Sequence, residues 1–175
     1  QSVSAFAGNP LMVDLDDLVR QGWLPWTPRQ GFDHHRCDFE RVAPWRMACL
    51  RKAWNGFAER ASDVCRAALA DFCTEHAHWL DDYALFMALF NTHGMKPWWE
   101  WTEPLRQRDK KALANVRTQH AQEIDFWRFV QWCWEQQCTA LKRYANDKGV
   151  ALIGDIPIYV ADNSADVWSR PDLYH

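Results

Sequence analysis

The stretch GVALIGDIPIYV, residues 149–160, decides the fold that the sequence predicts. Its apolar residues are mostly β-branched and nearly continuous, which is typical of a parallel strand covered on both faces. The residues before it, from Gln122 to Asp147, follow helical spacing with one apolar face, and Gly149 ends that helix. A long helix that ends in Gly and leads into a buried strand is an αβ unit, so the sequence predicts the α/β class.

The rest of the sequence predicts helices. Apolar residues recur at helical spacing, and capping or stop residues bound several of these segments. The predicted helices cover residues 11–19, 39–57 with Pro44 in the first turn, 62–74 with Ser62 as N-cap, 79–90 before a stop at Gly94, and 106–118. The chain is therefore expected to be mostly α, with one clear strand at Val150–Ile156.

A single strand cannot form a sheet, because each strand needs hydrogen-bonding neighbours. No second stretch of this sequence reads as a partner for Val150–Ile156, so we expect the chain to be a fragment of a larger structure. An unpaired β-branched edge recruits other strands, so we also expect the isolated chain to self-associate through this segment.

The composition argues against several classes of protein. The 175 residues carry 20 Lys and Arg against 23 Asp and Glu, so no basic excess points to nucleic acid. The longest apolar run, Tyr83–Phe90, is far shorter than the ~20 residues of a membrane span. Twelve tryptophans indicate either an aromatic-rich core or a surface that stacks flat ligands such as sugars.

The six cysteines and the first ten residues bear on the compartment. Most of the cysteines lie at apolar helical positions and no CxxC occurs, so we expect free thiols in a reducing compartment, the cytoplasm. Residues 1–10 hold no charged segment and no long apolar segment, so they do not read as a signal peptide.

Acidic positions beside the predicted strand are candidates for chemistry. Asp155 lies at the end of the strand, where α/β barrels carry their active sites, although a carboxylate that caps backbone N–H groups is an equally weighted alternative. Asp162 to Asp166 could form a calcium loop, but the segment lacks the central Gly and distal Glu of an EF-hand. Ser164 as the N-cap of a helical turn is the favoured interpretation.

Other polar clusters favour structural roles. No metal site is expected, because the His and Cys residues of segments 34–37 and 73–78 match no structural zinc spacing. Asp81 and Asp82 are adjacent on a predicted helix and point about 100° apart, so they are poorly placed to share a proton. We expect them to be ion-pair partners.

The aromatic segment Trp98–Trp101, WWEW, could form a platform that stacks the apolar faces of sugar rings. An aromatic wedge that joins helices is the alternative, and it is slightly favoured. Trp127, Trp132 and Trp134 occupy positions in the long helix where core packing is expected.

Four stretches of the sequence, in the same order, resemble the amylomaltases, the 4-α-glucanotransferases of glycoside hydrolase family 77. The first three are QSVSAFAGNP at 1–10, WLDDYALFMA at 79–88 and PWWEWTEPLRQRD at 97–109. The fourth and longest runs from Phe126 through Gln131, Gln137, Leu141, Tyr144, Ala145 and Gly149 to GDIPIYVADNSADVW at 154–168. The last stretch is the most specific of the four, and together they span nearly the whole chain.

The resemblance implies a fragment of a (β/α)₈ TIM barrel with an inserted helical subdomain. Residues 1–22 would be a loop and helix after an early barrel strand, and residues 23–120 the helical insertion. Residues 121–175 would be a long helix, a barrel strand and the following loop.

The resemblance also implies transfer of α-1,4-glucan segments between maltodextrins by retaining transglycosylation, without a cofactor. The substrate-binding residues that it suggests in this chain are Gln1, Ser4, Asn9, Trp99 and Asp155, the last at the floor of the donor pocket. The family's nucleophile and acid/base follow His175, so no catalytic residue is expected in this chain and the chain alone should be inactive.

The alternative is a non-catalytic role, as a helical, Trp-rich module that binds carbohydrate or another protein. Such a module would explain the tryptophans without a nucleophile. Neither reading needs nucleic acid or a membrane as partner.

Overall fold

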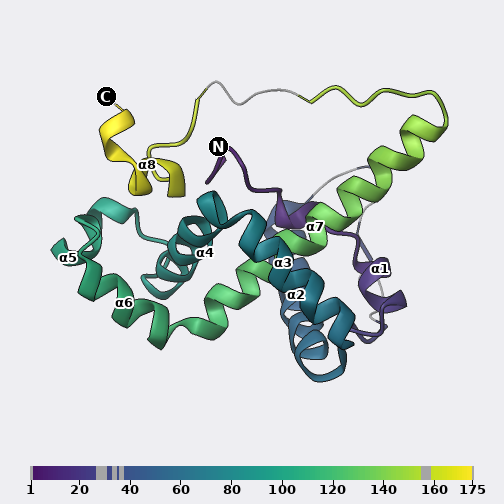
Figure 1. Cartoon of the computed structure of the whole chain (residues 1–175), viewed down its shortest axis with the longest axis horizontal. Coiled ribbons are helices and arrows are strands. Elements are labelled where there is room, and N and C mark those ends of the chain that lie inside the picture. Colours follow the sequence, from purple (N-terminus) through teal and green to yellow (C-terminus); the bar gives the residue numbers. More distant parts are fainter. Residues whose placement is uncertain (1, 27–30, 33–34, 36–37, 155–158, 175) are drawn as a thin grey trace. The chain divides into compact units, whose positions relative to one another are not determined.

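The computed structural model describes residues 2–26, 31–32, 35, 38–154 and 159–174, and within these ranges the ordered elements are all helical. The chain divides into two compact units, each assembled from separate stretches of sequence. Unit 1 contains residues 1–7, 72–128 and 151–175, and unit 2 contains residues 8–71 and 129–150. The long helix α7, Ala121–Asp147, contributes its first part to unit 1 and its second part to unit 2 (Figure 1).

The prediction of one clear strand, and with it an α/β class for this chain, is wrong for the described residues. Residues 150–154 form no ladder, and Val150, Leu152 and Ile153 are 53%, 50% and 95% exposed. A strand exists through hydrogen bonds to a neighbouring strand, and no described segment supplies such a neighbour. The end of the predicted strand, residues 155–156, lies outside the described residues.

Unit 2 is built on the long helix α2 and the second part of α7, with shorter elements beside them. It holds the 3₁₀ turn η1 (Pro10–Met12), α1 (Leu15–Arg20), α2 (Phe39–Arg60), α3 (Asp63–Glu75) as far as residue 71, and α7 from residue 129. Both η1 and α1 lie against α2. Asp38 begins α2 by accepting a hydrogen bond from the Arg41 amide, so Pro44 lies in the second turn rather than in the predicted first turn.

Aromatic rings fill the centre of unit 2. Phe57 of α2 lies between Trp23 and Phe129, with ring centroids 4.9 and 5.0 Å away. Trp132 packs on the same cluster, 5.5 Å from Phe57. All four side chains are at least nine-tenths buried, so the predicted packing role of Trp132 is confirmed.

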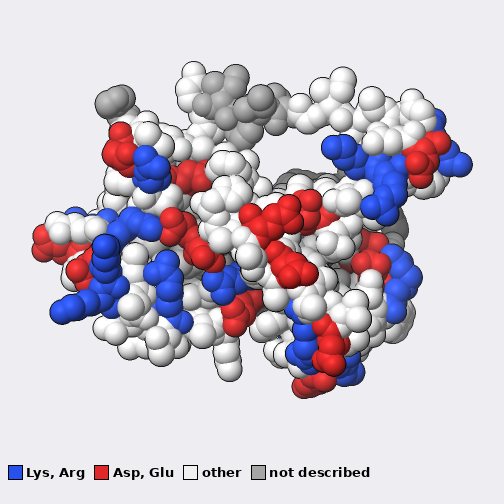
Figure 2. Space-filling model, viewed as in Figure 1, with Lys and Arg blue, Asp and Glu red and all other residues white. Residues whose placement is uncertain are grey.

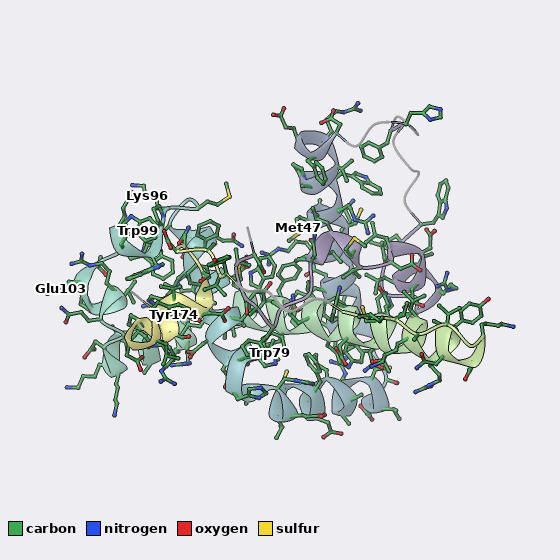
Figure 3. The ribbon with its side chains drawn as sticks, turned by 90° about the horizontal axis from the view of Figure 1, so that it is seen from above. Met47, Trp79, Lys96, Trp99, Glu103 and Tyr174 are labelled. Carbon is green, nitrogen blue, oxygen red and sulfur yellow. The ribbon has the colours of Figure 1, made fainter. Side chains whose placement is uncertain are left out.

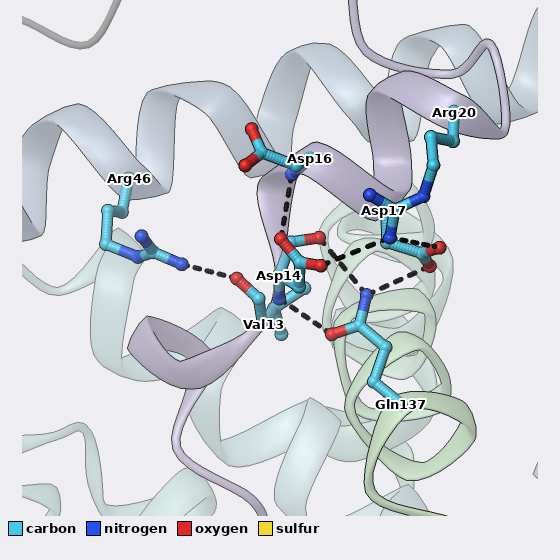
Figure 4. A network of polar contacts seen from close by, with 7 residues as sticks. All are labelled: Val13, Asp14, Asp16, Asp17, Arg20, Arg46 and Gln137. Carbon is cyan, nitrogen blue, oxygen red and sulfur yellow. Dashed lines mark hydrogen bonds and ion pairs between the residues drawn. The ribbon is translucent and has the colours of Figure 1, made fainter. Parts of the chain in front are cut away.

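Two glutamines of α7 hold the segment that leads into α1. The Gly8 amide donates to Gln131 Oε1 at 2.8 Å, and Gln131 Nε2 donates back to the Gly8 carbonyl at 3.0 Å. Gln137 repeats the arrangement with Asp14, at 2.7 and 3.2 Å, and also donates to Asp17 (Figure 4). Each amide side chain thus binds both polar groups of one residue's backbone.

Unit 1 surrounds the apolar helix α4 (Ala77–Thr92), whose middle is buried on every side. Its other elements are η2 (Trp98–Glu100), α5 (Glu103–Arg106), α6 (Lys110–Gln119), α8 (Ala165–Ser169) and η3 (Pro171–Leu173). The short helix α8 packs against α4 (Figure 1). Trp168 of α8 is fully buried, and its indole N–H donates to the Leu105 carbonyl at 3.0 Å.

Most of the predicted helix boundaries are confirmed. Ser62 caps α3 by accepting from the Cys65 amide, and Gly94 and Gly149 follow α4 and α7 with positive φ angles of 65° and 75°. The predicted continuous helix over residues 106–118 is wrong. Arg108 has a φ of 56° and separates α5 from α6, and Asp109 then caps the new helix.

The paired aspartates of α4 bind different cations, as the sequence predicts. Asp82 contacts Arg108 at 2.6 Å, and Asp81 contacts Arg128 at 2.6 Å. The Arg108 guanidinium also lies 4.4 Å from the Trp168 ring centroid. Arg108 therefore ties α4 to α8 across the break between α5 and α6.

Acidic and basic side chains are interspersed on the face drawn in Figure 2, and neither sign covers it. Among the described residues, no helix combines the length and apolarity that crossing a membrane requires.

Substituting Gln131 by Met should destabilise the chain. The Gly8 N–H and C=O would stay buried without partners, at about 1–3 kcal/mol for each group. We expect Gln131→Met to lower the free energy of unfolding in urea by about 2–6 kcal/mol. Gln136→Met, on an exposed position of the same helix, should change it by no more than about 0.5 kcal/mol. Equal effects of the two variants would contradict the role of Gln131.

The Arg108 contact predicts a second stability effect, in unit 1. Arg108→Met keeps an unbranched apolar stem but leaves Asp82, 31% exposed, without its cation and removes the charge over Trp168. We expect this variant to lower the free energy of unfolding by about 1–3 kcal/mol. The solvent-exposed Arg106→Met serves as control, and thermal unfolding monitored by circular dichroism compares the two.

Candidate functional site

The N-terminal segment and α8 are joined by one carboxylate. Asp166 accepts from the Ala5 amide at 2.6 Å and from Ser4 Oγ at 3.1 Å, and the Ala165 amide donates to the Val3 carbonyl at 2.8 Å. The predicted site residue Ser4 is only 2% exposed, and its Oγ also accepts from the Phe6 amide at 3.2 Å. Ser4 thus fixes the shape of the segment from inside unit 1.

An open cavity of about 450 Å³ lies beside this junction, here called the Phe6 pocket. Phe6, 60% exposed, stacks on Trp79 of α4 with ring centroids 6.2 Å apart and planes 18° apart. Asp82, Asp166 and Tyr174 also line the cavity. The pocket therefore combines an aromatic wall with carboxylates, in a size range of roughly 300–1,000 Å³ that is common for small-molecule sites.

A second open cavity adjoins the first, because Val160 and Tyr174 line both. It holds about 580 Å³ and is called here the Trp99 pocket, after the more exposed of the two tryptophans that line it. Figure 3 labels Trp79, Trp99 and Tyr174, which together mark the two pockets.

Residues 162–164 lead into α8, and Ser164 caps this helix as the sequence predicts. Ser164 Oγ accepts from the Val167 amide at 3.2 Å and begins α8, so the capping interpretation is confirmed. Asn163 and Asp162 instead bind Trp98: Asn163 Oδ1 accepts from its backbone amide at 3.2 Å, and the Asp162 carbonyl accepts from its indole N–H at 2.9 Å.

The structure gives the tryptophans of the WWEW segment different surroundings. Trp101 is 3% exposed and packs on Phe86 and Trp168, with ring centroids 5.4 and 5.6 Å away, so it is the aromatic wedge. Trp99 is 45% exposed and faces the pocket that bears its name.

Arg170, which lines the Phe6 pocket, forms an exposed ion pair with Asp172. Arg170 donates to both carboxylate oxygens of Asp172, at 3.0 and 2.9 Å. These hydrogen bonds lower the pKa of Asp172 and raise that of Arg170. The charges of Arg170 and Asp172 therefore cancel each other beside the pocket.

Burial makes the Cys73 and Cys133 thiols poor nucleophiles. Burial raises the pKa of the Cys133 thiol well above its usual range, and burial raises that of Cys73 as well. The described cysteines, at positions 49, 65, 73, 133 and 138, form no disulfide among themselves, and Cys37 lies outside the described residues. A raised thiol pKa leaves little thiolate to act as a nucleophile.

The other predicted site residues are distributed as follows. Asn9 belongs to unit 2, where it is exposed and caps η1 by accepting from the Leu11 amide at 2.9 Å. Gln1 and Asp155 lie outside the described residues. Within the described ranges no group of three His, Cys, Asp or Glu side chains is placed to hold a metal ion.

Sequence reasoning missed Asp166, Phe6 and Tyr174 as parts of the site. The signal for Asp166 is weak, since an acidic residue in the first turn of a helix is common. Phe6 and Tyr174 lie in segments without helical spacing, so the hydrophobic pattern does not predict whether their side chains are buried or exposed. Only the folded chain brings residues 6, 79 and 174 together.

Comparison with known proteins places this arrangement in a family. The whole chain, residues 1–175, matches the family model described as 4-alpha-glucanotransferase, of glycoside hydrolase family 77. It is 44% identical to the 4-α-glucanotransferase of Thermus thermophilus, over 100% of this chain and 35% of that protein. It is 34% identical to the enzyme of Clostridium butyricum, over 99% of this chain and 36% of that protein.

A solved structure agrees. The amylomaltase of Streptococcus agalactiae, determined in complex with acarbose, matches with a TM-score of 0.90 at 34% identity, covering 99% of this chain and 36% of that one. The chain thus spans about a third of the length of the relatives that it matches. The match over all 175 residues shows that the chain belongs to the 4-α-glucanotransferases of glycoside hydrolase family 77.

Proposed function

We propose that this chain is part of a 4-α-glucanotransferase that moves α-1,4-glucan segments between maltodextrins. The observation that carries the proposal is the family match over the whole chain, supported by relatives of that name at 44% and 34% identity. The amylomaltase with the similar structure was determined with acarbose, which supports a carbohydrate substrate. The open pockets lined by aromatic rings and carboxylates suit such a ligand.

The proposed reaction is retaining transglycosylation. A carboxylate attacks the anomeric carbon while a carboxylic acid protonates the departing sugar oxygen, and the resulting base then activates an acceptor glucan in place of water. The family resemblance assigns both carboxyl groups to positions after those of this chain. The residues assigned here, Ser4, Asn9, Trp99, Gln1 and Asp155, would shape the substrate site, and no cofactor is needed.

The remaining assignments extend this proposal. Residues 1–22 and 121–175 would belong to a (β/α)₈ barrel and residues 23–120 to its helical insertion. We assign the enzyme to the cytoplasm because of its thiols, whereas the relative in Arabidopsis thaliana is named as chloroplastic or amyloplastic.

The proposed activity predicts the products of the complete protein encoded by the gene. Incubated with maltotriose, that protein should release glucose and form longer maltodextrins, which chromatography of the products would detect. The 175-residue chain alone should give no turnover above a buffer blank. A complete protein without disproportionating activity would refute the proposal and leave the non-catalytic binding module.

Asp155 provides a more specific test in the complete protein. If it shapes the donor pocket, Asp155→Asn should lower turnover by at least ~10²-fold, or roughly 2.7 kcal/mol of transition-state stabilisation. Asp147→Asn, an exposed position near the end of α7, is the matched control and should keep normal turnover. Near-normal rates in both variants, measured at equal thermal stability, would reduce Asp155 to a structural residue.

Self-association of the 175-residue chain is the last expectation of this group. Ile153 is 95% exposed in an apolar segment without a described partner, so copies should associate through it. Light scattering after size-exclusion chromatography should show a mass above 20.6 kDa, and Ile153→Lys should restore the monomer. Val64→Lys, on an exposed position of α3, should leave the association unchanged. A monomeric unmodified chain would contradict this expectation.

A further inference from the structure

Asp166 has both of its carboxylate oxygens engaged by the N-terminal segment. Oδ2 accepts from the Ala5 amide at 2.6 Å, and Oδ1 accepts from Ser4 Oγ at 3.1 Å. An ionised carboxylate can only accept, so the Ser4 hydroxyl gives its one hydrogen to Asp166 and keeps its lone pairs for another donor. That donor is the Phe6 amide, 3.2 Å from Ser4 Oγ. One carboxylate therefore fixes the backbone of residues 4–6.

The helix that carries Asp166 is anchored in the core of unit 1. Trp168, two residues later, is fully buried and donates its indole N–H to the Leu105 carbonyl at 3.0 Å. The Ala165 amide donates to the Val3 carbonyl at 2.8 Å, which adds a second link between α8 and the segment. Asp166 thus connects the core to a stretch that has no helix or strand of its own.

The shape of the segment matters at the Phe6 pocket, because the segment forms part of its wall. Ala5 and Phe6 both line this cavity of about 450 Å³. The Phe6 side chain is 60% exposed, so burial does little to hold it in place. Ser4 is 2% exposed, and its hydroxyl already binds Asp166 and the Phe6 amide. Ser4 therefore contributes to the pocket through the shape of the segment.

We propose that Asp166 is a positioning residue for the transfer reaction, which keeps residues 4–6 in the shape that the substrate meets. Both of its oxygens bind the segment, so it acts through Ser4 and the Ala5 amide and not as a ligand of the sugar. This inference rests on the proposed function.

The role predicts an effect on substrate binding and not on the chemical step. A protein in which the segment holds its shape in only a tenth of the molecules binds substrate about tenfold more weakly. The substrate and the transition state would meet the same ordered segment. A change that weakens both equally raises KM and leaves kcat unchanged.

Disproportionation of maltotriose by the complete protein tests this role. Asp166→Ala should raise KM about tenfold and change kcat by no more than about twofold. Asp166→Asn keeps an oxygen that can accept from the Ala5 amide and gains an N–H that can donate to Ser4 Oγ, so its KM should stay within about threefold of the unmodified value. Asp109→Ala removes a carboxylate that caps α6 in the same unit, and it should leave KM unchanged.

Ser4→Ala tests the path from Asp166 to the Phe6 amide. It removes that path but leaves the Ala5 hydrogen bond, so KM should rise by only about threefold. Added to Asp166→Ala it should raise KM no more than about twofold further, because both changes break one path. Independent contacts of the two side chains with the substrate would make their effects multiply. If Asp166→Ala does not fold, Ser4→Ala alone decides.

Hydrogen exchange followed by mass spectrometry gives a readout that needs no turnover. The peptide that covers residues 2–8 should exchange faster in Asp166→Ala than in Asp109→Ala, because the segment opens more often. Peptides from α4 should exchange alike in both variants, which would show that the core of unit 1 is intact.

Three results would overturn the positioning role in an active protein. They are a normal KM in Asp166→Ala, a fall in kcat of tenfold or more at unchanged KM, and unchanged exchange of residues 2–8. An unmodified complete protein without disproportionating activity would instead refute the proposed function, and this role with it. The two failures are therefore distinguishable.

Discussion

The buried amide of Gln131 is the contact on which unit 2 depends. Gly8 has both its N–H and its C=O on that side chain, and a Cβ at Gly8 would lie 2.0 Å from the Trp134 ring. Because the Trp134 ring lies so close, only glycine fits at position 8. Gly8 is buried and belongs to no helix, so its N–H and C=O need hydrogen-bond partners from a side chain. Gln131 supplies that pair, and Gln137 does the same six residues later for Asp14. Together they hold the backbone just before η1 and α1, whose N-caps are Asn9 and Asp14.

In unit 1, hydrogen bonds to side chains also hold the irregular segments. Its irregular segments, residues 2–7 and 159–164, have no strand or helix to satisfy their polar groups. Asp166 binds the first segment, and Trp98 binds the second through Asp162 and Asn163. Because those anchors come from α8 and η2, the geometry of the two pockets is tied to two very short helices. Short helices depend on tertiary contacts, here on the burial of Trp168 and on Arg108.

The helix ends could be predicted because they depend on the conformational preferences of single residues. Features that depend on contacts between distant residues could not be predicted. Ser62, Gly94 and Gly149 mark helix ends through their own backbone preferences, so the sequence identifies them. The strand prediction failed because apolar β-branched residues need a neighbouring strand, which composition cannot supply. The break at Arg108 is similar: its positive φ is stabilised by contacts with Asp82 and Trp168, residues 26 and 60 positions away. Of the candidate site, the sequence identified the exposed Trp99 but not Asp166, Phe6 or Tyr174.

The tryptophans show why the count alone could not decide between a core and a binding surface. Five of the twelve are buried, and two are exposed. The buried ones are Trp23, Trp101, Trp127, Trp132 and Trp168, and the exposed ones are Trp26 and Trp99. For tryptophans in the α-helices, helical spacing indicates which ones face the core. It gives no such indication for WWEW, where Trp101 is buried and Trp99, two positions earlier, is exposed. Trp99 lies inside the 3₁₀ turn η2 and Trp101 is its C-cap, and this turn directs the Trp101 indole into the core and leaves Trp99 in water. One short motif therefore contains both a core residue, Trp101, and an exposed candidate binding residue, Trp99.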